Sequence, residues 1–445
     1  MRSRVPAALA RAKFPEPLLE VLRRLAGAGH RSWIVGGAVR DLLLHRRREA
    51  SDYDVATPAT PPEVTALFRK VVPTGVEHGT VTVVLGDRAI EVTTFRGEGA
   101  YVDGRRPESV TFHTDLEADL ARRDFTINAL AYDPLGREFR DPFGGRADLR
   151  RRVVRAVGDP AARFGEDGLR AMRAVRFAAQ LGYALHPGTR RAIPGALDVV
   201  RKVSLERITD ELLKLVLAPH ADRGVALLRA TGLLGVILPP VAALPARELA
   251  HSARMLPALP PEAALRLAAL VHRVSSGPPA PPGEDPAALL GTLRLPRRTV
   301  ETAAALVRAH ACFQGGRAAA LPRSERDVRR WLSAAGPEHA EPLLALSAAD
   351  AAALPAARAR GARAESETLR RTTAAVLRAR APLTTQDLAL DGRAVMQVLG
   401  AGPGPHVGEA LRHLLERVLE DPSENEPACL ADGLRQWWAA RSARL

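Results

Sequence analysis

The spacing of hydrophobic and polar positions changes once along the chain, near residue 150. Before that point, short apolar runs and alternating segments predict strands between short amphipathic helices. From Pro160 onward, apolar positions recur almost wholly at helical spacing. We therefore expect an α+β protein of several domains. The predicted domains are a head with a small mixed sheet (1–150), followed by an all-helical neck (151–220), body (221–380) and tail (381–445).

The first part of the head combines acidic residues with glycines. Trp33 to Val35 reads as a buried strand, Gly36 and Gly37 follow, and a helix and a second strand with Asp52 and Asp54 come next. Two acids one position apart on a strand point to one face and repel each other unless a cation lies between them. The glycines permit close approach to the backbone, and a helix start attracts an anion. This stretch predicts a cation site beside an anion site, as metal-dependent chemistry on a nucleoside triphosphate requires.

Later segments of the head complete its expected elements. Thr80 to Leu85 and Ala89 to Phe95 predict a hairpin, and Leu116 to Leu130 predicts a helix. The polar, glycine-rich segment Gly97 to Pro107 predicts a loop. Glu91, on the second hairpin strand, is either a third metal carboxylate or a plain surface acid.

The motif ARRDFTINALAYD, residues 121–133, contributes candidate polar contacts. Arg122 and Arg123 are adjacent, so on a helix they diverge and only one needs to face phosphates, for which the planar guanidinium is suited. Asp124 and Asn128 are four residues apart and share a helical face. The pair either holds a ribose hydroxyl or serves as an N-terminal acid and a capping residue.

A long helix is predicted from Gly165 to Leu181. Its acidic and basic residues recur every three positions on one face: Asp167, Arg170, Arg173 and Arg176. This face is either simply solvated or binds an anion, because three arginines in a row repel each other. The opposite side is apolar, with Leu169, Met172, Val175 and Phe177.

Asp167 and Arg170 also match the edge of a nucleotide base. Cytosine and adenine both present an amino donor beside a ring-nitrogen acceptor, whereas uracil and guanine present a carbonyl beside an N–H. A carboxylate with a guanidinium therefore accepts C and A and rejects U and G, because mismatched buried polar groups stay unpaired.

Composition adds a preference for polyanions. The formal charge is +14, which draws nucleic acid to the surface, although a solvated arginine-rich surface is an equally good reading. The two cysteines, Cys312 and Cys429, give neither a disulfide framework nor a zinc spacing. No run is long enough to span a bilayer, so we expect a soluble cytoplasmic protein that does not bind membranes.

Taken together, these motifs resemble the class II tRNA nucleotidyltransferases, the family of the CCA-adding enzyme and bacterial poly(A) polymerase. The resemblance is strong over roughly residues 30–220, and a weaker match covers Leu390 to Leu411. The motifs that carry it are GGAVRDLLL, SDYDVATPATP, GVEHGTVTVV, RRDFTINALAYD, GEDGLRAMRAVRF and ERITDELLKLV. Within the weaker match, GAGPGPHVG is either a phosphate-contacting turn or an ordinary helix-breaking loop.

The resemblance implies a nucleotidyltransferase head of the polymerase-beta-like type and a two-metal reaction. Asp52 and Asp54 would be the catalytic residues and would hold Mg²⁺. Gly37, Arg40 and Arg123 would bind the triphosphate. An RNA 3′-hydroxyl would attack the α-phosphorus of CTP or ATP and release pyrophosphate.

It also implies which residues select the nucleotide. Asp124 and Asn128 would lie near the ribose, and Asp167 and Arg170 would act as a protein template for the base. Two further arginines would orient Arg170 or contact the nucleotide, namely Arg173 and Arg176. The expected partner is tRNA, gripped by the basic helical part, and no protein partner is inferred.

The family's members differ in product. The segment GVEHGTVTVV is similar to the tRNA enzymes, and the Gly97–Pro107 loop, whose loss is associated with CC-only addition, is present. We therefore favour full CCA addition, then A-only or CC-only addition, then poly(A) synthesis. A non-catalytic RNA-binding protein is the rival of a different class.

A hydrolase is a third reading. His251 and the segment Leu265 to Val274 resemble the His-Asp phosphohydrolase region of some relatives. Here, however, Arg273 follows His272 where an acid would be needed, which should abolish a metal site. We expect this region to serve packing or RNA contact.

Overall fold

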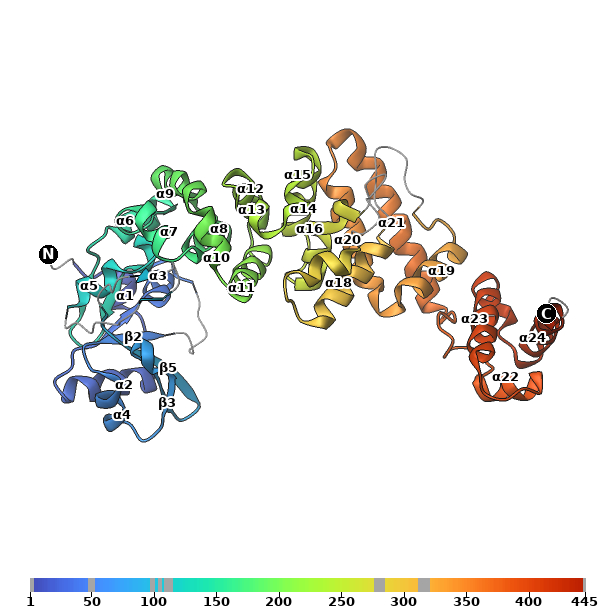
Figure 1. The fold of residues 1–445 in the computed structure, drawn as a ribbon, viewed down its shortest axis with the longest axis horizontal. Helices are drawn as coiled ribbons and strands as arrows, with labels where there is room; N and C mark the ends of the chain where they lie inside the picture. Colours follow the sequence, from blue (N-terminus) through green and yellow to red (C-terminus); the bar gives the residue numbers. More distant parts are fainter. Residues whose placement is uncertain are drawn as a thin grey trace. The chain divides into compact units, whose positions relative to one another are not determined.

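The computed structural model describes residues 4–46, 53–96, 101–102, 106–107, 115–275, 285–310 and 321–442 (Figure 1). Asp52 and most of the predicted Gly97–Pro107 loop therefore lie outside the described residues. The chain forms two compact units, Met1–Ala243 and Leu244–Leu445. The finer division into head, neck, body and tail stays a prediction.

The first unit is built on a seven-stranded mixed sheet in the order β3-β4-β5-β2-β1-β8-β9. Strands β2 and β5 run parallel, and the other pairs of this sheet run antiparallel. The buried strand at Trp33 and the hairpin of β4 and β5 are confirmed. The strands are β1 (Trp33–Val35), β2 (Asp54–Thr57), β3 (Val71–Gly75), β4 (Thr80–Leu85), β5 (Arg88–Thr94), β8 (Ala131–Asp133) and β9 (Glu138–Arg140).

Short helices pack against this sheet. Helix α2 (Glu16–Gly27) buries one apolar stripe, and α4 (Pro61–Leu67) begins at a capping box in which Thr60 and Glu63 bond each other's backbone. Helix α4 packs on β4 and β5. The core on the β1 side of the sheet gathers Trp33, Val35, Ala56, Phe95, Leu116, Leu120, Ala129, Ala131 and Val157.

The helix predicted from Leu116 to Leu130 is wrong in its second half. Helix α5 (Leu116–Ala121) ends early, the backbone is extended at Phe125, and a single 3₁₀ turn covers Thr126–Asn128. Phe125 is fully buried and its backbone bridges Ala156. Pairing with another segment and burial of a large ring therefore override the helical pattern of the sequence.

The long helix predicted from Gly165 to Leu181 is interrupted. Helix α7 (Pro160–Glu166) stops, Asp167 is extended, and α8 (Leu169–Leu181) starts anew. At Gly168 the backbone passes Val200 so closely that a Cβ would lie 2.6 Å from its nitrogen. Close packing against the neighbouring segment therefore sets the break, and glycine permits it.

The rest of the first unit is mainly helical, and α8 packs against α11 (Leu205–Val216) and α12 (Ala221–Ala230) (Figure 1). The remaining elements are α1 (Ala7–Ala10), α3 (Gly37–Leu43), β6 (Tyr101–Val102), β7 (Arg106–Pro107), α6 (Gly145–Arg151), β10 (Val153–Val154), β11 (Ala184–Leu185), α9 (Pro187–Ala192), α10 (Leu197–Lys202), α13 (Leu233–Ile237) and α14 (Pro239–Ala242).

In the second unit every described regular element is a helix, which confirms the helical pattern. Among its described residues, one apolar core gathers around Leu332 and Leu369 and another around Leu414 and Leu434. Among the described helices, none is long and apolar enough to cross a membrane. The helices are α15 (Ala246–Met255), α16 (Ala263–Ser275), α17 (Pro286–Gly291), α18 (Arg297–Ala309), α19 (Glu325–Ala335), α20 (Ala340–Ala353), α21 (Ala356–Arg378), α22 (Gly392–Leu399), α23 (Pro405–Glu420) and α24 (Pro427–Ser442).

Candidate active site

A polar cavity of about 510 Å³ in the first unit brings the predicted site residues together. It is formed by the β1–α3 turn, the start of β2, the segment after α5, the 3₁₀ turn, the α7–α8 junction, one face of α8, and α11. Every predicted site residue within the described part of the chain lines it. They are Gly37, Arg40, Asp54, Arg123, Asp124, Asn128, Asp167, Arg170, Arg173 and Arg176.

The acidic edge of the cavity lies at the start of β2. Asp54 is exposed there and pairs in register with Glu91 on the parallel strand β5, which places both carboxylates on one face. Carboxylate oxygens are the donors that hard divalent cations take in proteins, so these residues fit a metal. The register shows Glu91 as a neighbour of Asp54, and whether Glu91 is a metal ligand stays open.

The glycine turn lies against a pair of arginines. Gly36 has φ +70°, and a Cβ at this position would lie 3.0 Å from Arg123 Nη1. Arg122 and Arg123 both bond Asp119, which is fully buried. Burial opposes ionisation of Asp119, but the two arginines outweigh it and lower its pKa.

The prediction that Arg122 and Arg123 diverge is therefore wrong, because both line the cavity. Helix α5 ends at Ala121, so neither arginine lies within it. Their shared acid, Asp119, draws both guanidinium groups to the same side.

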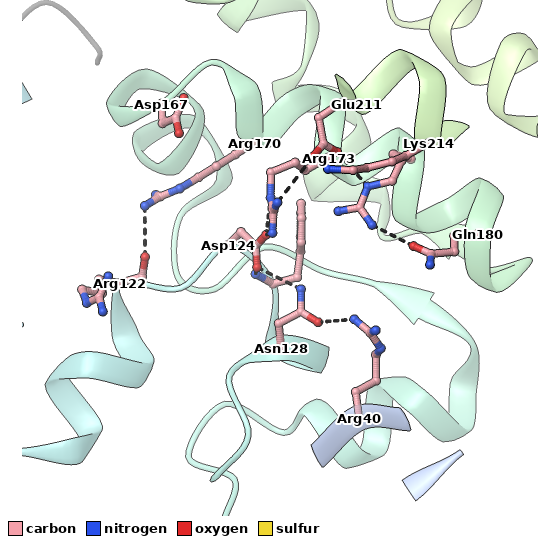
Figure 2. A network of polar contacts seen from close by, with 12 residues as sticks. Arg40, Arg122, Asp124, Asn128, Asp167, Arg170, Arg173, Gln180, Glu211 and Lys214 are labelled. Carbon is pink, nitrogen blue, oxygen red and sulfur yellow. Dashed lines mark hydrogen bonds and ion pairs between the residues drawn. The ribbon is translucent and has the colours of Figure 1, made fainter. Parts of the chain in front are cut away.

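A continuous chain of hydrogen bonds crosses the cavity (Figure 2). Arg40 Nη1 donates to Asn128 Oδ1 at 2.7 Å, and Asn128 Nδ2 donates to Asp124 Oδ1 at 3.0 Å. Arg173 Nε donates to Asp124 Oδ2 at 2.8 Å. Burial alone would raise the pKa of Asp124, but Arg173 and Asn128 outweigh it and hold the pKa below its usual value. The carboxylate therefore stays ionised and all four side chains are fixed in orientation.

The predicted base-reading pair is held by groups outside its own helix. Arg170 Nη2 donates to the backbone carbonyl of Arg122 at 3.0 Å (Figure 2). Asp167 accepts from Leu169 N at 3.0 Å and from Arg207 Nη2 at 2.8 Å. Arg170 is thus held by the segment that follows α5, and Asp167 by α11 and the first residue of α8.

The arginine stripe of α8 is neutralised by carboxylates, so its repulsion does not by itself require an anion. Glu211 on α11 is only 3% exposed and accepts from Arg176 Nε at 2.7 Å. Its other oxygen lies 3.5 Å from Arg173 Nη1. The predicted repulsion of these cations is therefore wrong, because Glu211, a buried acid of another helix, pairs with two of them.

Phe177 has a role that the apolar pattern missed. Its ring is buried and also lines the cavity. The guanidinium carbons of Arg176, Arg40 and Arg173 lie 3.7, 5.2 and 5.4 Å from the ring centroid. The ring thus makes cation–π contacts with three guanidinium groups.

Sequence reasoning also missed Arg207, Glu211, Gln180 and Asp119. A signal for the first two was present, because Arg207 and Glu211 are four residues apart in the motif ERITDELLKLV and share a helical face. The other two gave none, because only the fold brings Gln180 to the cavity and holds both cavity arginines on Asp119.

Comparison with known proteins places this site in a family. A family model described as the poly A polymerase head domain matches residues 32–155. A second, described as a probable RNA and SrmB-binding site of polymerase A, matches residues 182–244. A CCA-adding enzyme of Geobacillus stearothermophilus is 40% identical over 92% of this chain and 93% of its own length. The chain belongs to the CCA-adding enzyme family.

Other members of the family agree over similar lengths. The CCA-adding enzyme of Geobacillus kaustophilus is 39% identical over 92% of this chain and 94% of its own. The crystal structure of the Bacillus stearothermophilus CCA-adding enzyme in complex with CTP is 34% identical. It superposes with a TM-score of 0.74 and covers 97% of this chain and 99% of that one. The α+β fold is that of this family.

Proposed function

We propose that this chain adds C, C and A in turn to the 3′ end of tRNA, using CTP and ATP and releasing pyrophosphate. The observation that carries the proposal is the shared cavity, where Asp54 and the glycine turn face Asp167 and Arg170. Asp54 and the glycine turn suit a metal-bound triphosphate, and Asp167 with Arg170 suits a nucleotide base. One nucleotide bound across the cavity would satisfy both ends.

The reaction is an in-line displacement. The RNA 3′-hydroxyl oxygen forms a bond to the α-phosphorus, the bond from that phosphorus to the bridging oxygen breaks, and pyrophosphate leaves. The donor set at the start of β2 fits Mg²⁺, with Asp54 and, from the sequence, Asp52 as its ligands. When bound, Mg²⁺ supplies activation of the hydroxyl and stabilisation of the phosphate charge.

The chain's own residues hold the triphosphate and the sugar. Arg123, fixed by Asp119 and packed on Gly36, presents its fork to phosphate oxygens beside the glycine turn. Arg40 also binds the triphosphate. Its hydrogen bond to Asn128 fixes the orientation of the guanidinium before the nucleotide binds. Asp124, ionised and bonded to Asn128 and Arg173, lies near the ribose and keeps both of these side chains in place.

Base choice falls to Asp167 and Arg170. Asp167 accepts from the amino group of C or A, and Arg170 donates to the adjacent ring nitrogen. Arg207 and the Leu169 amide occupy only part of the acceptor capacity of Asp167, because a carboxylate has about four lone-pair sites. U and G would leave a buried donor or acceptor unpaired and are rejected.

The test is a nucleotide-addition assay with the purified full chain. Its substrates are tRNA lacking the 3′ CCA, tRNA ending in CC, and an unrelated RNA, each with labelled CTP, ATP or both. We expect C and A to enter the first, A alone to enter the second, and neither to enter the third. EDTA should stop the reaction and excess Mg²⁺ should restore it.

Two results would redirect the assignment. Addition of A to the CC-ending tRNA without C addition to the shorter one would make the chain an A-adding enzyme. Long tails of A on the unrelated RNA would make it a poly(A) polymerase. Asp52→Ala should abolish transfer and leave tRNA binding largely intact, whereas Asp87→Ala, at a highly exposed acid beside β5, should transfer normally.

A further inference from the structure

The second unit contains a buried group of imidazole and charged side chains. His251 lies on α15, His272 and Arg273 on α16, and Asp350 on α20, and each is at most 9% exposed. Donor atoms of His251, His272 and Asp350 lie within 4.8 Å of one another. By itself this donor set would suit a transition metal.

Arg273 places a cation of the chain's own in that group. Its Nη2 lies 3.2 Å from Asp350 Oδ1 and 3.1 Å from His251 Nε2. The guanidinium therefore contacts two of the three donor side chains. A metal ion bound there would meet a permanent positive charge at short range, which costs far more inside a protein than in water.

A separate cavity of about 360 Å³ has Arg273 and His251 as its buried residues. Its exposed residues include three further arginines, Arg247 and Arg254 on α15 and Arg358 on α21. Arg254 is fixed by two bonds to the carbonyl of Ala353, at 2.8 and 3.1 Å. The cavity lies wholly within the second unit and is distinct from the nucleotide cavity of the first.

The charge in this cavity is strongly one-sided. Of the described residues that line it, four are arginines and one, Glu248, is an acid. Glu248 lies 3.1 Å from Arg247 Nε and 3.7 Å from Arg273 Nε, so the cations around it offset its charge. Asp350 lies behind Arg273 and orients it. The net effect is a concave, positively charged site with one guanidinium fixed at its base.

We propose that this cavity binds one phosphate group. Arg273 contacts the phosphate from below, and Arg247, Arg254 and Arg358 surround it at the mouth. Arginine forks match phosphate oxygens in paired hydrogen bonds, and the buried base strengthens the attraction. The phosphate belongs to an RNA backbone or to a small phosphate compound such as pyrophosphate, and this assignment does not rest on the reaction proposed for the first unit.

The test compares two double variants that each remove two exposed arginines. Arg247→Ala/Arg358→Ala alters the cavity, and Arg360→Ala/Arg363→Ala removes the same charge from exposed positions of α21 that do not line it. Binding of fluorescent tRNA is measured by anisotropy over a range of salt. Binding of labelled pyrophosphate is measured by equilibrium dialysis. Circular dichroism and thermal melting check that both double variants fold like the native chain.

Either of two results supports the proposal. If RNA supplies the phosphate, the cavity variant binds tRNA roughly ten-fold more weakly than the control and its salt slope falls by about 1. If a small compound supplies it, the cavity variant loses one bound pyrophosphate per chain and binds tRNA like the control. Equal behaviour of the two variants in both measurements would overturn the proposal.

Discussion

Arg207 on α11 donates to the carboxylate of Asp167 at the α7–α8 junction, with 2.8 Å between Nη2 and Oδ2. The backbone N–H of Leu169 donates to the other oxygen of Asp167 at 3.0 Å. The carboxylate that we assign to base choice is therefore oriented before a nucleotide enters. Preorganisation of this kind makes a wrong base costly, because the site does not readjust to it.

Arg207→Ala should weaken nucleotide selection more than it weakens the reaction. Without Arg207, the Asp167 carboxylate is free to rotate and to accept from the N–H of uracil or guanine. We expect the preference for CTP over UTP, measured as a ratio of kcat/KM values, to fall about ten-fold, or about 1.4 kcal/mol. Arg201→Ala, at an exposed arginine of α10, is the matched control. An unchanged ratio in Arg207→Ala would show that Asp167 does not need this support.

Glu211→Gln should destabilise the first unit. The substitution removes the charge partner of Arg176, whose side chain is 9% exposed, and loosens Arg173. Leaving one member of a buried ion pair uncompensated costs about 3 kcal/mol. Thermal unfolding followed by calorimetry should show a clearly lower midpoint, whereas Asp210→Asn, at an exposed neighbour, should not change it. Equal midpoints would mean that solvent already screens this pair.

Gly168→Ala and Gly165→Ala should have opposite effects on stability. A Cβ at Gly168 would lie 2.6 Å from Val200 N, whereas a Cβ at Gly165 meets nothing within 4 Å. The first change must displace the start of α8, and with it Arg170. The second replaces a helical glycine and should stabilise the chain by up to about 1 kcal/mol. Thermal melting of both variants, with nucleotide addition as a second measure, distinguishes them, and similar results for the two would contradict the packing argument.

Part of the fold and of the candidate site could be predicted from the sequence. Trp33–Val35, the β4–β5 hairpin and the helical second unit followed from periodicity, since apolar spacing reports burial directly. Ten of the residues that line the active-site cavity followed from motifs, whose spacing reflects chemistry, whereas Phe177, Gln180 and Arg207 did not. Helix ends were less predictable, because the extended backbone at Phe125 and the break at Gly168 depend on contacts with residues distant in sequence.

The supporting residues of the site were the least predictable. Asp119 looks like an ordinary helical acid in the sequence, and Glu211 is marked only by its spacing from Arg207; the fold brings each to two arginines. Phe177 belongs to an apolar stripe by spacing and to the cavity by position. A pattern reports which face a residue occupies, but it does not report which other element that face meets.

His272, one of the buried histidines of the second unit, should make stability depend on pH. Burial, with His310 nearby, holds the pKa of His272 well below its usual value of 6.5. Below pH 6.5 the unfolded chain therefore takes up a proton that the folded chain does not. This lowers the free energy of unfolding by at most about 1.4 kcal/mol per pH unit.

Thermal midpoints of the full chain between pH 7 and pH 5 measure this effect. His272→Asn keeps a donor for the Ala269 carbonyl but does not titrate, so its midpoint should fall less on acidification than that of the native chain. His339→Asn, which replaces a ring that also bonds a helix carbonyl, is the matched control and should fall like the native chain. If the midpoint of His272→Asn falls as much as that of the native chain, His272 is not the source of the pH dependence.

The central claim is that Asp167 and Arg170 choose the nucleotide, while Asp54 at the start of β2 and, from the sequence, Asp52 support its transfer. The most direct measurement sequences the 3′ ends made from tRNA lacking CCA when all four nucleoside triphosphates are present. The native chain should make CCA, and Asp167→Ala should still extend the tRNA but insert U and G as well. Clean CCA ends from Asp167→Ala would contradict the claim, because base choice would then lie elsewhere.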